Sequence, residues 1–106
     1  MASGETLDAV RESAQSINDV ITYARVGTVA LITLDSPPVN ALGGAVRQGL
    51  MAAFARAAAD PEAHAVVLAC AGRTFIAGAD IREFDAPAPD APDLLEVLAQ
   101  IDACPK

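Results

Sequence analysis

Three small residues in a row, Ala77, Gly78 and Ala79, are the part of the chain whose types and spacing could do chemistry. Asp80 follows them and opens a short polar and apolar segment, Ile81 to Phe84, that is typical of a helical turn. The first amides of a helix have no partner within the helix and lie at the positive end of its dipole, so they can donate to an anion or to a polarised carbonyl. Because no bulky side chain shields the backbone here, we predict that the amide of Ala79 is one donor of an oxyanion hole.

The same small residues could instead cap a helix that packs against a neighbouring strand, and on spacing alone this is the commoner arrangement. Other chemistry has little support in the sequence. His64 is the only histidine and stands before a predicted strand, away from the carboxyl ends of strands where α/β sheets bind ligands, so we interpret it as a surface residue. No serine or cysteine has an evident base beside it, and the chain carries no glycine-rich phosphate motif.

A predicted strand leads into the small residues. The apolar run from Ala65 to Ala71 stops at Gly72, and its length and composition are typical of a strand buried on both faces. Upstream, Ile21 to Val26 and Val29 to Leu34 flank Gly27 and predict a hairpin. The second strand of this hairpin is expected to be central in the sheet, and the first to lie nearer an edge.

A helix is predicted between the hairpin and the later strand. Its apolar positions predict a helix from about Gly44 to Ala59 that ends at Asp60-Pro61, because the residue before a proline avoids the helical conformation. Strand, helix and strand in succession form a right-handed crossover, so the strands that contain Val29 and Val66 should run parallel in one sheet. The sequence thus predicts an α/β fold.

The two ends of the chain are less regular. Thr6 to Asn18 is expected to be either an amphipathic helix or disordered, so that residues 1–20 form an N-terminal extension to a domain over residues 21–106. Near the other end, the alternating prolines of residues 86–92 predict an exposed linker. Asp90 and Pro92 are start signals for a last helix, whose predicted apolar face is Leu94, Leu98 and Ile101.

Composition excludes several classes of function. The 7 basic and 14 acidic residues give a net charge of -7, which disfavours nucleic acid as a partner. No apolar run approaches the roughly 20 residues of a membrane span, so no membrane segment is expected. Cys70 and Cys104 lack metal-ligand spacing, so we predict reduced thiols and no metal site. The first residues show neither a secretory nor a transit signal, and a cytoplasmic location is expected.

Two motifs resemble a known family. Residues 72–84, GRTFIAGADIREF, resemble the oxyanion-hole motif of the enoyl-CoA hydratase/isomerase family, the crotonases. Val29 to Leu34 and the following PPVNAL of residues 37–42 resemble that family's first long strand and the loop after it. The resemblance covers roughly Ile21 to Lys106. Within the family, the chain is most similar to the N-terminal part of multifunctional fatty-acid oxidation proteins, which continue into a 3-hydroxyacyl-CoA dehydrogenase.

The resemblance implies the N-terminal part of a crotonase-like ββα spiral fold and a fatty acyl-CoA thioester as substrate, with coenzyme A as part of that substrate and no separate cofactor. Ala79 would stabilise an enolate. Arg73 and Arg82 flank this segment and are candidates for the CoA phosphates, although either alone is more commonly a solvated surface charge. Asn40 is expected to form a structural turn with its own backbone. The expected substrate contacts are Pro38, Val39, Ala77, Gly78, Asp80 and Ile81.

The resemblance also implies that part of the catalytic machinery lies outside these 106 residues. The family's second oxyanion donor comes from a glycine-rich segment that this sequence does not contain. None of the chain's five glutamates matches the family's catalytic acid or base; these glutamates are Glu5, Glu12, Glu62, Glu83 and Glu96. We therefore predict that the chain alone is inactive. Apolar surface that the missing part would cover predicts that the chain self-associates. The expected partner is another copy, in a homo-oligomer, or the rest of a larger parent chain. The alternatives are a non-catalytic crotonase-like scaffold, a thioesterase, dehalogenase or decarboxylase of the same family, or an unrelated α/β fragment.

Overall fold

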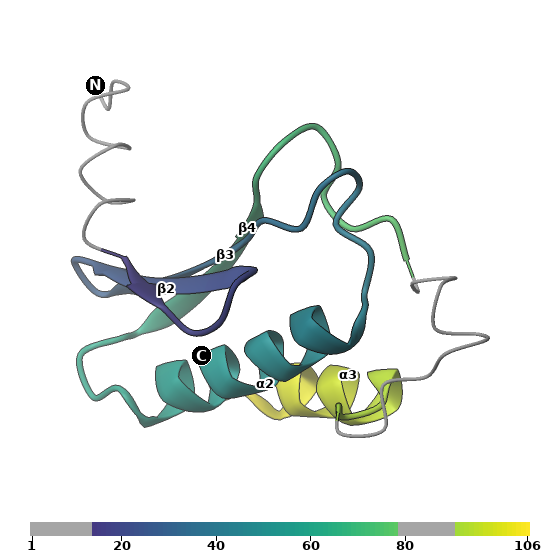
Figure 1. Cartoon of the computed structure of the whole chain (residues 1–106). Coiled ribbons are helices and arrows are strands. Elements are labelled where there is room, and N and C mark those ends of the chain that lie inside the picture. The colour runs from purple at the N-terminus through teal and green to yellow at the C-terminus, as the bar shows by residue number, and fades with distance from the viewer. Residues whose placement is uncertain (1–13, 79–90) are drawn as a thin grey trace.

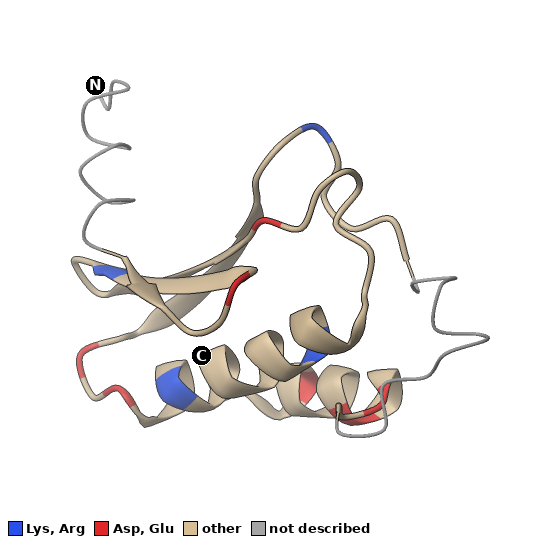
Figure 2. Cartoon of the chain, viewed as in Figure 1, with Lys and Arg blue, Asp and Glu red and all other residues tan. Residues whose placement is uncertain are grey.

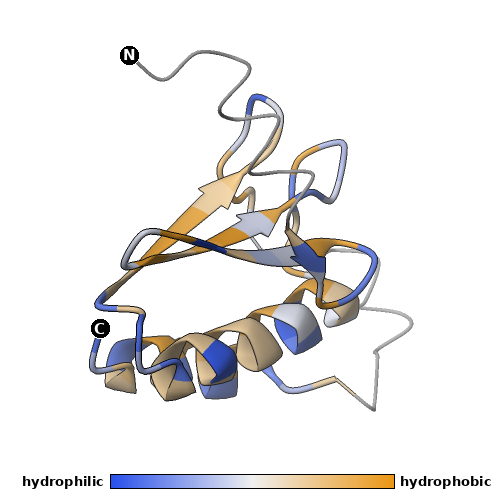
Figure 3. Cartoon of the chain, turned by 90° about the vertical axis from the view of Figure 1, so that its left-hand side faces the viewer, coloured by the Kyte–Doolittle hydropathy of each residue, from blue (hydrophilic) through white to orange (hydrophobic). Residues whose placement is uncertain are grey.

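The computed structural model describes residues 14–78 and 91–106, which form a four-stranded sheet with helices on one face (Figure 1). The strands lie in chain order across the sheet. A view along the layers shows the sheet on one side and the helices packed beneath it (Figure 3). The elements are β1 (Gln15–Ser16), β2 (Ile21–Val26), β3 (Val29–Leu34), α2 (Gly44–Ala59), β4 (Ala65–Cys70) and α3 (Leu94–Ala103).

The predicted hairpin and the parallel pair are both confirmed. β2 pairs with β3 in antiparallel register from Ile21 opposite Leu34 to Val26 opposite Val29, and Gly27 makes the turn with a φ of 61°. β3 pairs with β4 in parallel, from Val29 beside Ala65 to Leu34 beside Cys70. β3 is therefore central, as predicted, and the carboxyl ends of β3 and β4 lie side by side.

The predicted helix Gly44–Ala59 is α2, with the same bounds. Its apolar stripe packs on the sheet face that carries Ile21 and Ile32, and the two isoleucines are fully buried. The contact is close, because a Cβ at Gly49 would lie 2.4 Å from Cγ1 of Ile21. The buried side of α2 consists of Gly44, Val46, Gly49, Leu50, Ala53, Phe54 and Ala57.

The prediction that β4 is buried on both faces is wrong. β4 is the last strand of the sheet, and Val67 in its middle is 47% exposed. Val66 and Leu68 turn toward the core, so the apolar run marks a strand with one covered face. The physical reason is that, among the described residues, helices cover one side of the sheet only (Figure 3).

The last helix is confirmed, but its predicted apolar face is partly wrong. Asp93 caps α3, with Oδ1 accepting from the amide of Glu96 at 2.8 Å, whereas Asp90 lies outside the described residues. Val97 is 1% exposed and Leu98 is 50% exposed, so Val97 takes the core position expected for Leu98. On the same helix, Nε2 of Gln100 donates to the carbonyl of Met51 in α2 at 2.8 Å.

Residues 15 and 16 form a strand, so the helix expected over Thr6–Asn18 does not extend to Asn18. β1 pairs antiparallel with β2, Gln15 opposite Tyr23. Asn18 accepts from the amides of Val20 and Ile21 through Oδ1, at 3.1 and 2.9 Å, which turns the chain into β2. Residues 6–13 of the predicted segment lie outside the described residues. In the parts of the chain that are described, no helix is long and apolar enough to cross a membrane.

Candidate functional site

The loop after β3, residues 35–43, and the loop after β4, residues 71–78, lie side by side at the carboxyl ends of two parallel strands (Figure 1). Open α/β sheets bind their ligands at this edge. Two backbone hydrogen bonds mark the ends of the contact. The amide of Ala71 donates to the carbonyl of Leu34 at 2.8 Å, and the amide of Leu42 donates to the carbonyl of Gly78 at 2.7 Å.

Asn40 joins the two loops between these points. It is 3% exposed and has a φ of 54°, a left-handed conformation that asparagine tolerates. Its Oδ1 accepts from the amide of Ser36 at 2.8 Å, which is the local turn that the sequence predicts. Its Nδ2 also donates to the carbonyls of Ala71 at 2.9 Å and Thr74 at 2.6 Å. The local turn is therefore only part of what Asn40 does.

Four of the predicted substrate contacts lie on these loops. Pro38 and Val39 are exposed in the first loop, where the Pro37-Pro38 peptide bond is cis. Ala77 is exposed in the second loop, and Gly78 has a φ of 118°, which favours glycine. Arg73 is exposed on the same loop. The other predicted site residues lie outside the described residues: Ala79, Asp80, Ile81 and Arg82.

Arg47 connects two segments close to the loops, and the sequence analysis gave it no role. Its Nε donates to the carbonyl of Pro92 at 2.7 Å, and its NH1 group donates to the carbonyl of Leu42 at 2.6 Å. The side chain thus ties the approach to α3 to the loop after β3. A basic residue in the first turn of a helix opposes the helix dipole, and α2 has no acidic residue there. This unfavourable placement is the sequence signal that could have indicated a specific contact for Arg47.

A hollow of about 400 Å³ lies on the other face of the sheet, and it contains none of the predicted contacts. Among the described residues that line it, the charged ones are Asp19 and Asp35, and their carboxylates would repel a phosphorylated ligand. Burial raises the pKa of the Cys70 thiol at its edge. We therefore place the candidate site at the two loops. Figure 2 shows the described charged residues spread over turns, helices and β2, with Lys and Arg not grouped in one place.

Residues 24–102 match the family described as enoyl-CoA hydratase/isomerase. The chain belongs to the enoyl-CoA hydratase/isomerase family. Its expected fold class is confirmed by a solved enoyl-CoA hydratase/carnithine racemase from Magnetospirillum magneticum, which superposes with a TM-score of 0.73 at 33% identity. That match covers 93% of this chain and 40% of the solved chain.

Curated relatives of this enoyl-CoA hydratase/isomerase family member include a bifunctional enzyme. The chain is 47% identical over 76 residues to the peroxisomal bifunctional enzyme of Danio rerio, which covers 72% of this chain and 10% of that protein. It is 48% identical over 54 residues to a probable enoyl-CoA hydratase of Mycobacterium tuberculosis, covering 50% of this chain and 21% of the relative. The chain therefore spans only a small part of the curated relatives that it matches.

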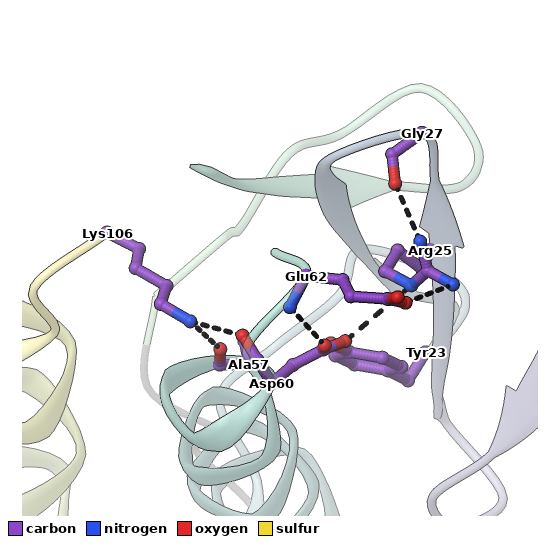
Figure 4. Close-up of polar contacts among 7 residues, drawn as sticks. All are labelled: Tyr23, Arg25, Gly27, Ala57, Asp60, Glu62 and Lys106. Atoms are coloured by element: carbon purple, nitrogen blue, oxygen red, sulfur yellow. Dashed lines mark hydrogen bonds and ion pairs between the residues drawn. The ribbon is translucent and has the colours of Figure 1, made fainter. Parts of the chain in front are cut away.

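At the end of the sheet away from the two loops, this family member has a polar cluster of Tyr23, Arg25, Asp60, Glu62 and Lys106 (Figure 4). Asp60 accepts from the Tyr23 hydroxyl at 3.0 Å, and Glu62 pairs with Arg25 at 2.8 Å. The backbone amide of Glu62 lowers the pKa of Asp60, aided by Tyr23, Arg25 and Lys106. Lys106 donates to the carbonyls of Ala57 and Asp60 at the end of α2. These contacts stabilise the fold, and they occupy Glu62.

The described residues contain no group of three histidine, cysteine or acidic side chains placed to hold a metal ion. His64 is exposed, as predicted, and its amide donates to the carbonyl of Thr28. Cys70 and Cys104 are both free thiols.

Proposed function

We propose that this chain supplies the acyl-CoA-binding part of an enoyl-CoA hydratase/isomerase and stabilises the enolate of a fatty acyl thioester. The observation that carries the proposal is the 2.7 Å hydrogen bond from Leu42 to Gly78. It brings the loop of Pro38 and Val39 beside the segment that leads into Ala79. Both loops would contact the ligand, with the amide of Ala79 donating to the thioester oxygen. One such donor is typically worth about 3 kcal/mol of transition-state stabilisation.

The held carbonyl of Gly78 supports this role for the next amide. In a planar trans peptide unit, the carbonyl of one residue and the N–H of the next point in opposite directions. The Gly78 carbonyl itself is engaged by the amide of Leu42. In the proposed site, the N–H on the other side of that peptide unit donates to the thioester oxygen.

Coenzyme A is an anion, so a chain with a net charge of -7 must bind it through local groups. Arg73 is exposed on the loop that also carries Ala77 and Gly78. We assign it to the CoA phosphates, and extend the assignment to Arg82 by the resemblance alone. No other cofactor is proposed.

We further propose that the chain alone does not turn over substrate, and that the acid and base come from the rest of a larger protein or assembly. Glu62 is paired with Arg25 in the polar cluster, and Glu96 lies on the exposed first turn of α3. Neither lies on the two loops. A thioesterase, a dehalogenase, a decarboxylase and a non-catalytic scaffold would share the same binding role.

The test is an NMR titration of the 15N-labelled 106-residue chain with crotonyl-CoA. We expect shift changes in the amides of residues 36, 39–42 and 72–78, and about threefold to tenfold weaker binding for Arg73→Gln. Arg25→Gln removes the same charge from the distant polar cluster and should leave the affinity unchanged. Shift changes confined to the sheet-face hollow, or none at all, would reject the proposed site. Hydration of crotonyl-CoA at enzyme-like rates would reject the inactivity of the chain.

A further inference from the structure

We propose that Asn40 is a positioning residue for the acyl-CoA site: its side-chain amide sets the relative position of the two loops without touching the ligand. The inference rests on the proposed function, since it takes these loops as the walls of the site. At 3% exposure the Asn40 side chain is sealed from solvent. Any effect of this residue on a ligand must therefore pass through the backbone groups that it holds.

The bonding of the Asn40 amide is complete. Both hydrogens of Nδ2 are used, one on the carbonyl of Ala71 and one on that of Thr74, at 2.9 and 2.6 Å. Oδ1 accepts from the amide of Ser36 at 2.8 Å, and the backbone amide of Asn40 donates to the carbonyl of Ser36 at 2.8 Å. An amide that offers two donors and one acceptor in this order is available only from asparagine or glutamine.

These bonds form the middle step of a ladder between the loops. The first step is Ala71 to Leu34, beside the strands, and the last is Leu42 to Gly78, beside the proposed oxyanion amide. Without the Asn40 side chain, the hydrogen bonds that would remain between the two loops, among the described residues, are these two outer steps. The bond between Leu42 and Gly78 would then lose its nearest support.

The chemistry of the site makes aspartate a sharp probe. Asn40→Asp keeps the acceptor for Ser36 and tolerates the left-handed backbone, but it sets a carboxylate oxygen against two carbonyl oxygens. Asn40→Gly keeps the left-handed backbone and deletes every side-chain bond. Both variants therefore remove the two Nδ2 donors, and only Asn40→Asp adds repulsion between a carboxylate and the two carbonyl oxygens. Both are compatible with the backbone φ of 54° at this position.

The matched control is Tyr23→Phe. It removes one side-chain hydrogen bond, of 3.0 Å to Asp60, at the end of the sheet away from the loops. Hydrogen exchange of single amides by NMR separates a local effect from a global one. The probes are the amide of Leu42, which reports the last step of the ladder, and the amides in the middle of β3, which report the whole fold.

We expect Asn40→Asp to speed hydrogen exchange at the Leu42 amide by about tenfold more than at the amides of β3. The same variant should weaken crotonyl-CoA binding by about tenfold. Asn40→Gly should change both quantities in the same direction, but less. Tyr23→Phe should speed exchange throughout and leave the affinity as it is. If the Asn40 variants speed exchange equally everywhere, or if they keep wild-type affinity, the inference is overturned. If Asn40→Asp does not fold, Asn40→Gly decides the question alone. If the wild-type chain does not bind crotonyl-CoA, the proposed function fails, while exchange at Leu42 still tests whether Asn40 sets the relative position of the two loops.

Discussion

The amide of Leu42 donates to the carbonyl of Gly78 across 2.7 Å and so joins the loop after β3 to the loop after β4. Gly78 presents its carbonyl from a backbone with a φ of 118°. Residues that carry a Cβ rarely adopt this backbone conformation, which costs them about 1 to 3 kcal/mol. The contact that carries the proposed site therefore depends on a residue without a Cβ.

Gly78→Ala should accordingly loosen this contact. Among the described residues, apart from its chain neighbours, no atom lies within 4 Å of the added Cβ, so the expected cost comes from the backbone conformation. We expect faster exchange of the Leu42 amide and weaker crotonyl-CoA binding, with little change in the sheet. Gly27→Ala, at a φ of 61° in the distant hairpin turn, introduces strain that should leave both quantities unchanged. Equal effects of the two variants at Leu42 would argue against a local role for Gly78.

Gly49→Ala should destabilise the whole domain. A Cβ at this position would lie 2.4 Å from Cγ1 and 2.8 Å from Cβ of Ile21, so α2 would have to move away from β2. Overpacking of this kind costs about 1 to 3 kcal/mol, more than the roughly 1 kcal/mol that alanine gains over glycine in a helix. Urea unfolding measures the difference. Ala52→Gly on the exposed side of α2 is the control and should lose about 1 kcal/mol; a stabilised Gly49→Ala would show that the helix relaxes freely.

The polar cluster gives stability a defined pH dependence. The folded pKa of Asp60 lies below its ordinary value of 3.8, so this carboxylate stabilises the fold above about pH 4, and the contribution is lost as the pH falls toward the folded pKa. Burial and Asp60 raise the pKa of Tyr23 above 10.0, so its contribution is present below that pH and is lost above it. Urea unfolding at a series of pH values measures the free energy of unfolding. Its decrease at acid pH should be smaller in Asp60→Asn, and its decrease at alkaline pH should be smaller in Tyr23→Phe. If both variants lose stability at acid and alkaline pH as the unsubstituted chain does, these assignments are contradicted.

Lys106→Met should lower the free energy of unfolding by about 1 kcal/mol, because Nζ bonds the carbonyls of Ala57 and Asp60 at the end of α2. A cation at a helix C-terminus also complements the helix dipole. Lys106→Arg keeps the charge and the donors, and it should retain most of the stability. If thermal unfolding of Lys106→Met matches that of the native chain, the C-terminal contact is not a stabilising one.

Local patterns in the sequence determined the hairpin, the helix Gly44–Ala59 and the parallel pairing of β3 with β4. The hairpin follows from Gly27 at the turn, and the helix from apolar residues at helical spacing with Pro61 after its end. The parallel pairing follows from the order strand, helix, strand along the chain. The two family motifs likewise placed the candidate site on the loops after β3 and β4. Only tertiary structure decided that Val97, rather than Leu98, enters the core, because both positions fit the helical spacing and packing on α2 selects one.

The same holds for Asn40. The sequence suggested its turn with Ser36, since the two residues are close along the chain. Its bonds to Ala71 and Thr74 span more than 30 residues, and no local pattern encodes them. They exist because a parallel crossover brings the carboxyl ends of β3 and β4 to one edge of the sheet, where a buried amide meets carbonyls of the next loop. Residue types thus determined which groups could form the site, and the packing of distant segments decided which of them meet.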